Sequence, residues 1–243
     1  MSEPLYDWLG SKEVVYCKEN TITNRIAHRD PNRICLQNPN YFYSPVDGVI
    51  VYQKVVEASQ DPSKSAEVLT IANKPYNIRT LTGLNFFNKS CIVIGIYVTM
   101  IDVKVTRMPY SGIRQFVSLP TSPSMFAASS QSFEDTLLQG FIDYNKMEFC
   151  FFNPKRVNTV VNPNTNHTYY MIQTTPQHSQ SCIRDFRKTK EPIQQNERVD
   201  QVLAPYLMDI VVPFSINSSM SLQQDIGTHV KAGLDRILKV QRA

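Results

Sequence analysis

The chain has 243 residues, of which 42% are hydrophobic and 19% are charged, values that exclude a disordered protein because they provide enough apolar material for a core. The net charge of +4 is small for this length, so it does not by itself indicate a nucleic-acid partner. All-β folds often form a single unit of this size.

The composition of the chain changes near residue 40, from polar to richer in Val and Ile. Residues 1–40 are polar and contain Pro31 among charged residues, which predicts an irregular N-terminal arm with a short helix, followed by a single domain over residues 41–243. Gly48 to Glu57 is rich in Val and Ile and follows a Ser-Pro-Val-Asp-Gly turn, which is typical of a strand. Val68 to Ala72 predicts a second strand, and Tyr76 to Leu84 a short helical turn.

The remaining segments also favour strands. Cys91 to Val105 is β-branched and predicts one or two central strands, and residues 118–134 predict an exposed loop. Further segments with strand texture are Met147 to Phe152, Thr168 to Thr174, Ile210 to Phe214 and Val230 to Val240, although Ala232 to Leu238 is also compatible with a helix. The polar stretch from Gln173 to Gln195 predicts a solvated turn or sheet edge. The expected fold class is therefore mainly β (α+β), antiparallel, with short peripheral helices.

The cysteines, the histidines and the N-terminal residues limit the metal sites and the cellular locations that we expect for the protein. Five cysteines without a C-x-x-C pair argue against a disulfide framework and a cysteine zinc site, and His28, His167, His178 and His229 lack metal-ligand spacing, so we expect no metal. The N-terminus carries acidic residues and no apolar stretch of a secretory signal, and no apolar run reaches the ~18 residues of a spanning helix. We expect a cytoplasmic protein that is soluble or peripherally membrane-associated.

Four separated segments occur in the order found in one enzyme family. They are YFYSPVDGVIV from Tyr41, NKPYNIRTLTGL from Asn73, YVTMIDVKVTRMPYSG from Tyr97 and FCFFNPKRV from Phe149. Together these motifs resemble pyruvoyl-dependent phosphatidylserine decarboxylases over roughly residues 40 to 215, and the specificity lies in the set rather than in any single motif. The resemblance implies a decarboxylase-type antiparallel β domain and, because active relatives assemble as dimers, self-association.

The resemblance also implies which residues carry the chemistry. In the family, a precursor cuts itself at a Gly-Ser bond with the help of an Asp/His pair, and the serine becomes a pyruvoyl electron sink. Asp47 matches the family's aspartate, and Asp102 is in register. Lys104 and Arg107 stand at the two histidine positions, and Met208 stands at the former processing serine. An arginine cannot exchange protons near neutrality.

Each of these residues has a structural alternative. Asp47 is a remnant catalytic carboxylate or the cap of its own turn. Lys104 and Arg107 form an anion pocket with Asp47 and Asp102, or they are solvated charges at a strand edge. Leu9-Gly10-Ser11-Lys12 imitates the cleavage motif at the opposite end of the chain, where Gly-Ser is a frequent loop pair, so we expect no chemical role for it.

These departures predict a catalytically inactive relative without a pyruvoyl group. We expect it to keep the scaffold for binding a protein partner or an anionic ligand such as a phospholipid headgroup. The first alternative is an active, divergent phosphatidylserine decarboxylase that matures at a different serine. The second is a nucleic-acid-binding or structural assembly protein; the basic run from Arg184 to Lys190 contains Phe186, but a solvated turn is favoured for it over nucleic-acid binding.

Overall fold

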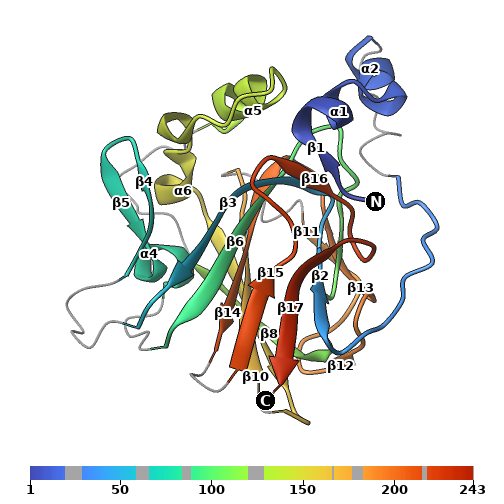
Figure 1. Cartoon of the computed structure of the whole chain (residues 1–243), viewed down its shortest axis with the longest axis vertical. Helices are drawn as coiled ribbons and strands as arrows, with labels where there is room; N and C mark the ends of the chain where they lie inside the picture. Colours follow the sequence, from blue (N-terminus) through green and yellow to red (C-terminus); the bar gives the residue numbers. More distant parts are fainter. Residues whose placement is uncertain are drawn as a thin grey trace.

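The computed structural model describes most of the chain. The described residues are 1–19, 29–58, 66–83, 89–119, 129–165, 167–176, 183–214 and 218–242. His28, His178 and Cys182 lie outside them. Within these ranges the molecule is built from antiparallel sheets with short helices, which confirms the predicted fold class (Figure 1).

The described strands form one large sheet and three small ones. The large sheet has the order β1-β16-β3-β6-β14-β10-β9-β8-β12. Its strands are β1 (Glu3–Pro4), β3 (Gly48–Val56), β6 (Cys91–Val98), β8 (Gly112–Leu119), β9 (Lys155–Asn162), β10 (His167–Thr174), β12 (Pro192–Ile193), β14 (Tyr206–Pro213) and β16 (Thr228–Val230). The small sheets are β11 (Ile183–Asp185), β13 (Arg198–Val202) and β7 (Val105–Arg107); β15 (Ser218–Leu222), β17 (Arg236–Arg242) and β2 (Tyr41–Tyr43); and β4 (Glu67–Ile71) with β5 (Lys74–Asn77).

The large sheet is buried on both faces, which explains why its central strands are apolar without interruption. Along β6, Val93 and Tyr97 belong to one cluster of buried residues, which we name the first core. Ile92, Ile94 and Ile96 belong to another, which we name the second core. Successive side chains of a strand point to opposite faces, so both faces must be covered. The helices and the β4-β5 sheet cover the first core, and the other two small sheets cover the second. Residues of β2, β13 and β17 contribute to that second core.

Short helices pack against the first core. They are α1 (Leu5–Leu9), α2 (Lys12–Glu19), α4 (Ile78–Thr82), α5 (Gln131–Leu137) and α6 (Phe149–Phe152), with a 3-10 turn at Tyr144–Lys146. The N-terminal residues are part of this packing, because β1 pairs with β16 and Trp8 of α1 is buried in the first core. Figure 1 shows α1, α5 and α6 near one end of the large sheet.

Most predicted elements are present, but the loop expected over residues 118–134 ends in α5, which buries Phe133 and Glu134, and two further predictions are wrong. The expected strand over Met147 to Phe152 is wrong, because this run forms α6, whose Phe149 and Cys150 are buried in the first core. A short apolar run is compatible with a buried helix or a buried strand, and periodicity does not separate them. The helical alternative for Ala232 to Leu238 is also wrong, because Gly233 has a φ of +73° in a turn that leads into β17.

Candidate active site

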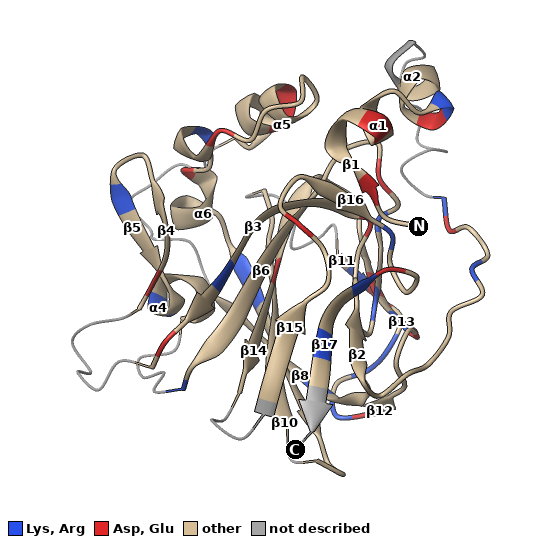
Figure 2. Cartoon of the chain, in the orientation of Figure 1, with Lys and Arg blue, Asp and Glu red and all other residues tan. Residues whose placement is uncertain are grey.

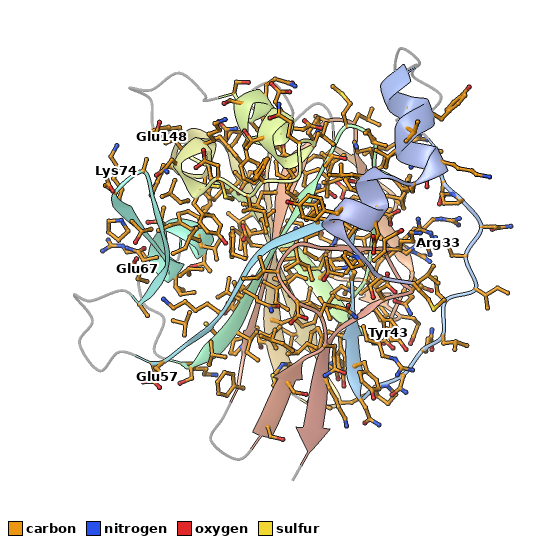
Figure 3. The ribbon with its side chains drawn as sticks, turned by 45° about the horizontal axis from the view of Figure 1, so that its top comes forward. Arg33, Tyr43, Glu57, Glu67, Lys74 and Glu148 are labelled. Carbon is orange, nitrogen blue, oxygen red and sulfur yellow. The ribbon has the colours of Figure 1, made fainter. Side chains whose placement is uncertain are left out.

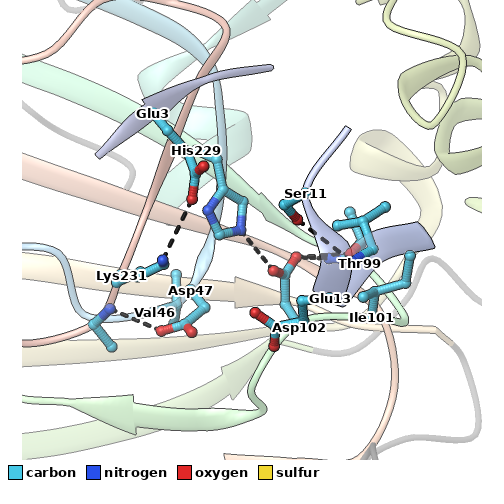
Figure 4. A network of polar contacts seen from close by, with 12 residues as sticks. Glu3, Ser11, Glu13, Val46, Asp47, Thr99, Ile101, Asp102, His229 and Lys231 are labelled. Carbon is cyan, nitrogen blue, oxygen red and sulfur yellow. Dashed lines mark hydrogen bonds and ion pairs between the residues drawn. The ribbon is translucent and has the colours of Figure 1, made fainter. Parts of the chain in front are cut away.

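Asp102 is the centre of a buried polar network between β6 and β7. One carboxylate oxygen accepts hydrogen bonds from the backbone N–H of Thr99 at 2.8 Å and from its hydroxyl at 2.7 Å. The other oxygen lies 2.7 Å from Nε2 of His229 (Figure 4). Burial alone would raise the pKa of Asp102, but the electrostatic attraction and hydrogen bond of the His229 ring lower it, as does the charge of Lys104. Asp102 is therefore held as a carboxylate.

His229 reaches this carboxylate from a distant part of the chain. It lies on β16, where it is paired in register with Glu3 of β1 and Val49 of β3. The Trp8 ring of α1 stacks on the imidazole, with ring centroids 4.3 Å apart and an interplanar angle of 9°. Nδ1 of His229 is buried and has no hydrogen-bond partner among the described residues. An imidazole oriented by a carboxylate, with its second ring nitrogen free, is the arrangement of a general base.

Lys104 and Glu134 add two further titratable groups. The Lys104 ammonium is buried and donates to the carbonyl oxygens of Thr99 and of Asp102, the latter at 3.0 Å. Burial lowers the pKa of Lys104 to about 8, against the opposing charges of Asp102 and Glu134. Glu134 of α5 accepts the backbone N–H of Met100, and burial raises its pKa. Its second oxygen has no partner within the described part of the chain.

Asp47 lies beside this network and is held by an extended segment. We name residues 29–40 the strap. Arg33 of the strap donates two hydrogen bonds to the Asp47 carboxylate, at 2.6 and 2.5 Å, and the backbone N–H of Ala232 adds a third at 2.8 Å. Arg29 of the same strap donates to the carbonyl of Ile101, next to Asp102, at 2.9 Å. The strap thus closes over both aspartates.

The structure gives different surroundings to the other predicted site residues. Arg107 is buried on β7 and donates to the carbonyl of Asn196 at 3.0 Å, with Asp30 of the strap 3.8 Å away. Burial lowers its pKa. Met208 is fully buried in the second core and is paired in register with Ile96 of β6. Asp47, Asp102 and Lys104 therefore lie together, whereas Met208 is part of the apolar packing.

The sequence did not reveal His229, Trp8, Glu134 or Arg33 as parts of the site. His229 is 127 residues from Asp102, and from the sequence it is a candidate for metal binding alone. A useful signal would have been its position within Thr-His-Val, a β-branched strand segment where a polar residue faces a buried neighbour. Arg33 and Glu134 come from segments expected to be an arm and a loop. Only the fold brings these four residues to Asp102 and Asp47.

Comparison with known proteins places these residues in a family. A family model described as phosphatidylserine decarboxylase matches residues 25–203. A curated relative from Methanocaldococcus jannaschii, named "Putative archaetidylserine decarboxylase proenzyme", is 33% identical over 85 residues. The alignment covers 35% of this chain and 37% of the relative, so the chain spans little more than a third of that relative's length. The matched model includes Asp47, Asp102 and Lys104 and ends before β14 and β16.

These matches overturn three predictions made from the sequence. A catalytically inactive relative, a chain that is not an enzyme and an absent pyruvoyl group are all contradicted, because the matched proteins are decarboxylases and the relative is named as a proenzyme. The predictions rested on Lys104 and Arg107 replacing two histidines and on Met208 replacing a serine. The structure supplies an imidazole from His229 instead. The position assigned to Met208 lies beyond the matched range.

Proposed function

This chain belongs to the phosphatidylserine decarboxylase family, and we propose that it is a carboxy-lyase that removes the serine carboxylate of phosphatidylserine or a closely related lipid as carbon dioxide. The observation that carries the proposal is the buried Asp102–His229 pair, with Nδ1 of the imidazole free. Because Asp102 is ionised, Nε2 of His229 carries the ring proton and donates a hydrogen bond to the carboxylate. Nδ1 then presents a lone pair to a reacting proton.

The chemistry needs an electron sink and groups that move protons. In the family a pyruvoyl carbonyl supplies the sink when it is present. His229 would take or return a proton through Nδ1, oriented by Asp102. Lys104, with a pKa of about 8, would give or accept a proton near neutrality, which the arginine at position 107 does not do. Trp8 and the strap keep water from the buried carboxylates.

The residues of β14 do not fit the formation of a pyruvoyl group. Leu207 and Met208 stand where the resemblance places Gly-Ser, and both are fully buried. The Gly-Ser step of this sequence is Gly10-Ser11, at the junction of α1 and α2. In place of the expectation from the sequence that this pair has no chemical role, we propose Ser11, the serine that follows the chain's single Gly-Ser bond, as the source of the group.

The contacts around Ser11 support this assignment. Two residues in the same N-terminal segment, on either side of Ser11, are tied to the network. Trp8 stacks on His229, and Glu13 pairs at 2.6 Å with Arg29, which binds the carbonyl of Ile101. Figure 4 draws Ser11 and Glu13 together with Thr99 and Asp102. In the uncut chain the Ser11 hydroxyl accepts the N–H of Val14 at 3.4 Å.

A lipid assay tests the proposed activity. The full chain is incubated with vesicles that contain phosphatidylserine, and carbon dioxide and phosphatidylethanolamine are measured. We expect conversion by the native chain and a rate about 10²- to 10⁴-fold lower for His229→Gln, because one general base is removed. The matched control is His167→Gln on β10, whose ring packs against Phe42. No product from the folded native chain, or equal rates for the two variants, would contradict the proposal.

A further inference from the structure

Two exposed apolar side chains project from the strap. Ile34 is 89% exposed and Leu36 is 68% exposed, while the alternate residues Arg33 and Cys35 are partly covered. The inward side of the strap is fixed, because Arg33 binds Asp47 and the Leu36 carbonyl accepts a 2.7 Å hydrogen bond from Asn196. The strap is therefore an anchored segment that presents two large aliphatic side chains to solvent.

A basic segment lies next to the strap. Residues 184–198 contain five Lys and Arg and three Asp and Glu. One of the acids, Asp185, is engaged with two inward-facing arginines, Arg114 and Arg156, at 3.0 and 2.7 Å. Phe186 is 39% exposed within this run. The outward charge of the segment is therefore more positive than the sequence count indicates.

The beginning of β13 joins the two segments. Asn196 binds the strap at Leu36, and Glu197 pairs with Arg187 at 3.3 Å. Arg198 pairs with Asp30 of the strap at 2.7 Å. Figure 2 shows Lys and Arg on this side of the molecule, and Figure 3 places Arg33 on the side opposite Lys74 and Glu67. We name the surface formed by Ile34, Leu36, Phe186, Arg187, Lys188 and Lys190 the docking face.

We propose that the docking face binds the surface of an anionic phospholipid bilayer. Aliphatic and aromatic side chains surrounded by Lys and Arg match such a surface, because the apolar groups enter the headgroup boundary and the cations pair with lipid charge. In the described part of the chain no helix is long and apolar enough to cross a membrane. The inference rests on the proposed function, since a lipid substrate requires the enzyme to meet a bilayer. It places that bilayer over the strap that covers Asp47.

Vesicle sedimentation tests the docking face apart from catalysis. Phosphatidylglycerol is the anionic probe, because it has no serine headgroup to react, and phosphatidylcholine is the neutral reference. We expect the native chain to bind phosphatidylglycerol vesicles, to bind phosphatidylcholine weakly, and to lose binding as salt rises. Lys188→Glu with Lys190→Glu should weaken binding at least about 25-fold, about fivefold for each cation removed. Ile34→Asn with Leu36→Asn should weaken it as well.

Matched controls keep the same chemistry on other faces. Lys54→Glu with Lys74→Glu repeats the charge change at exposed positions of β3 and β5, and Phe141→Asn replaces a side chain that is also largely exposed. We expect both controls to bind as the native chain does. Equal binding to the two lipids, or equal losses in the controls and the docking-face variants, would overturn the proposal. Retardation of RNA without vesicle binding would overturn it in favour of a nucleic-acid surface.

A second readout separates this proposal from the proposed function. Phosphatidylserine dispersed in detergent micelles reaches the site without a bilayer. If the charge-reversed docking-face variant converts micellar lipid at the native rate but converts vesicles poorly, both proposals stand. If it converts vesicles at the native rate, the docking face is wrong and the carboxy-lyase remains. If the native chain binds vesicles but converts neither form of lipid, the proposed function is wrong and the docking face remains.

Discussion

Two buried ionic networks in this molecule differ in whether their charged groups can gain or lose a proton. The site network contains Asp102, His229, Lys104 and Glu134, and the pKa values of Asp102, Lys104 and Glu134 are shifted. The arginine network lies between the large sheet and the β7-β13-β11 sheet. In it, Arg114 pairs with Asp200 at 3.1 Å and with Asp185 at 3.0 Å. Arginines stay charged at every working pH, so this second network exchanges no protons through its cations.

Both networks contain buried polar atoms that have no hydrogen-bond partner among the described residues. In the arginine network Asp200 is bound on both oxygens, by Arg114 and by Gln173, and Arg156 stacks 3.7 Å above the Phe116 ring. In the arginine network the unpaired atoms are Nε of Arg114 and of Arg156, and in the site network they are Nδ1 of His229 and one oxygen of Glu134. The unpaired atoms of the site network belong to side chains that can gain or lose a proton, whereas an arginine Nε keeps its proton. We read the arginine network as structural and the site network as functional.

The substitution Arg114→Met should have the largest effect, and its effects on stability and activity distinguish the two networks. It removes a fully buried cation, so that Asp200 keeps only its Gln173 contact and Asp185 its Arg156 contact, and we expect the free energy of unfolding to fall by about 3–5 kcal/mol. Urea unfolding followed by circular dichroism measures it, with exposed Arg184→Met expected within about 0.5 kcal/mol of the native chain. His229→Gln should show the reverse profile, with lost activity and a stability loss of about 1–2 kcal/mol at most. If the Arg114→Met variant kept its stability but lost its activity, the interpretation of the arginine network as structural would be wrong.

Asp209 is a buried carboxyl group that belongs to neither network and that also has a shifted pKa. Burial raises its pKa to about 7, and it is faced by Tyr52, Tyr76, Cys150 and Lys155 from β3, β5, α6 and β9. The Tyr52 hydroxyl donates to this carboxyl. The folded chain thus keeps a proton that the unfolded chain releases near its ordinary pKa of 3.8.

The sign of the pH dependence follows from that difference. The stability contributed by the Asp209 proton is complete below about pH 4 and is lost as pH rises towards about 7, with a slope of up to about 1.4 kcal/mol per pH unit. Asp209→Asn should remove this slope, because the amide is neutral throughout. Urea unfolding across this interval measures both chains. Equal slopes would show that Asp209 is already ionised in the folded state.

Gln173→Met is the smallest change and tests the pairing of the arginine network. The Gln173 amide donates to Asp200 at 2.9 Å, and a hydrogen bond to a charged group contributes about 1.5–3 kcal/mol. Methionine keeps the volume and removes the donor. We expect a loss of that size in the free energy of unfolding and unchanged decarboxylation. Reduced activity with unchanged stability would connect this network to the chemistry.

The sequence predicted those parts of the fold in which local chemistry and tertiary packing agree. The strand from Gly48 and the central strand from Cys91 are confirmed, because β-branched residues follow a Ser-Pro-Val-Asp-Gly turn or form a run buried on both faces. The short helical turn expected within residues 76–84 is confirmed as α4, which ends at Gly83 in the left-handed conformation. Phe149 to Phe152 was not predictable, because its helix depends on what the phenyl rings pack against.

The site shows the same limit. Asp47 and Asp102 were accessible because they belong to short motifs with fixed spacing. His229 was not, because its pairing with Asp102 arises only when β16 joins the sheet beside β3. The replacement of two motif histidines therefore led to a wrong prediction of inactivity. A function that needs an imidazole can obtain one from any strand that reaches the same carboxylate.

The most direct test of the account is the intact mass of the purified full chain before and after treatment with a hydrazine, which traps a carbonyl. We predict a peptide of residues 1–10 and a larger fragment that gains one hydrazone, with Ser11→Ala remaining whole and unreactive. A native chain that stays at 27.8 kDa and takes up no hydrazine would contradict the assignment of an active, self-processed decarboxylase.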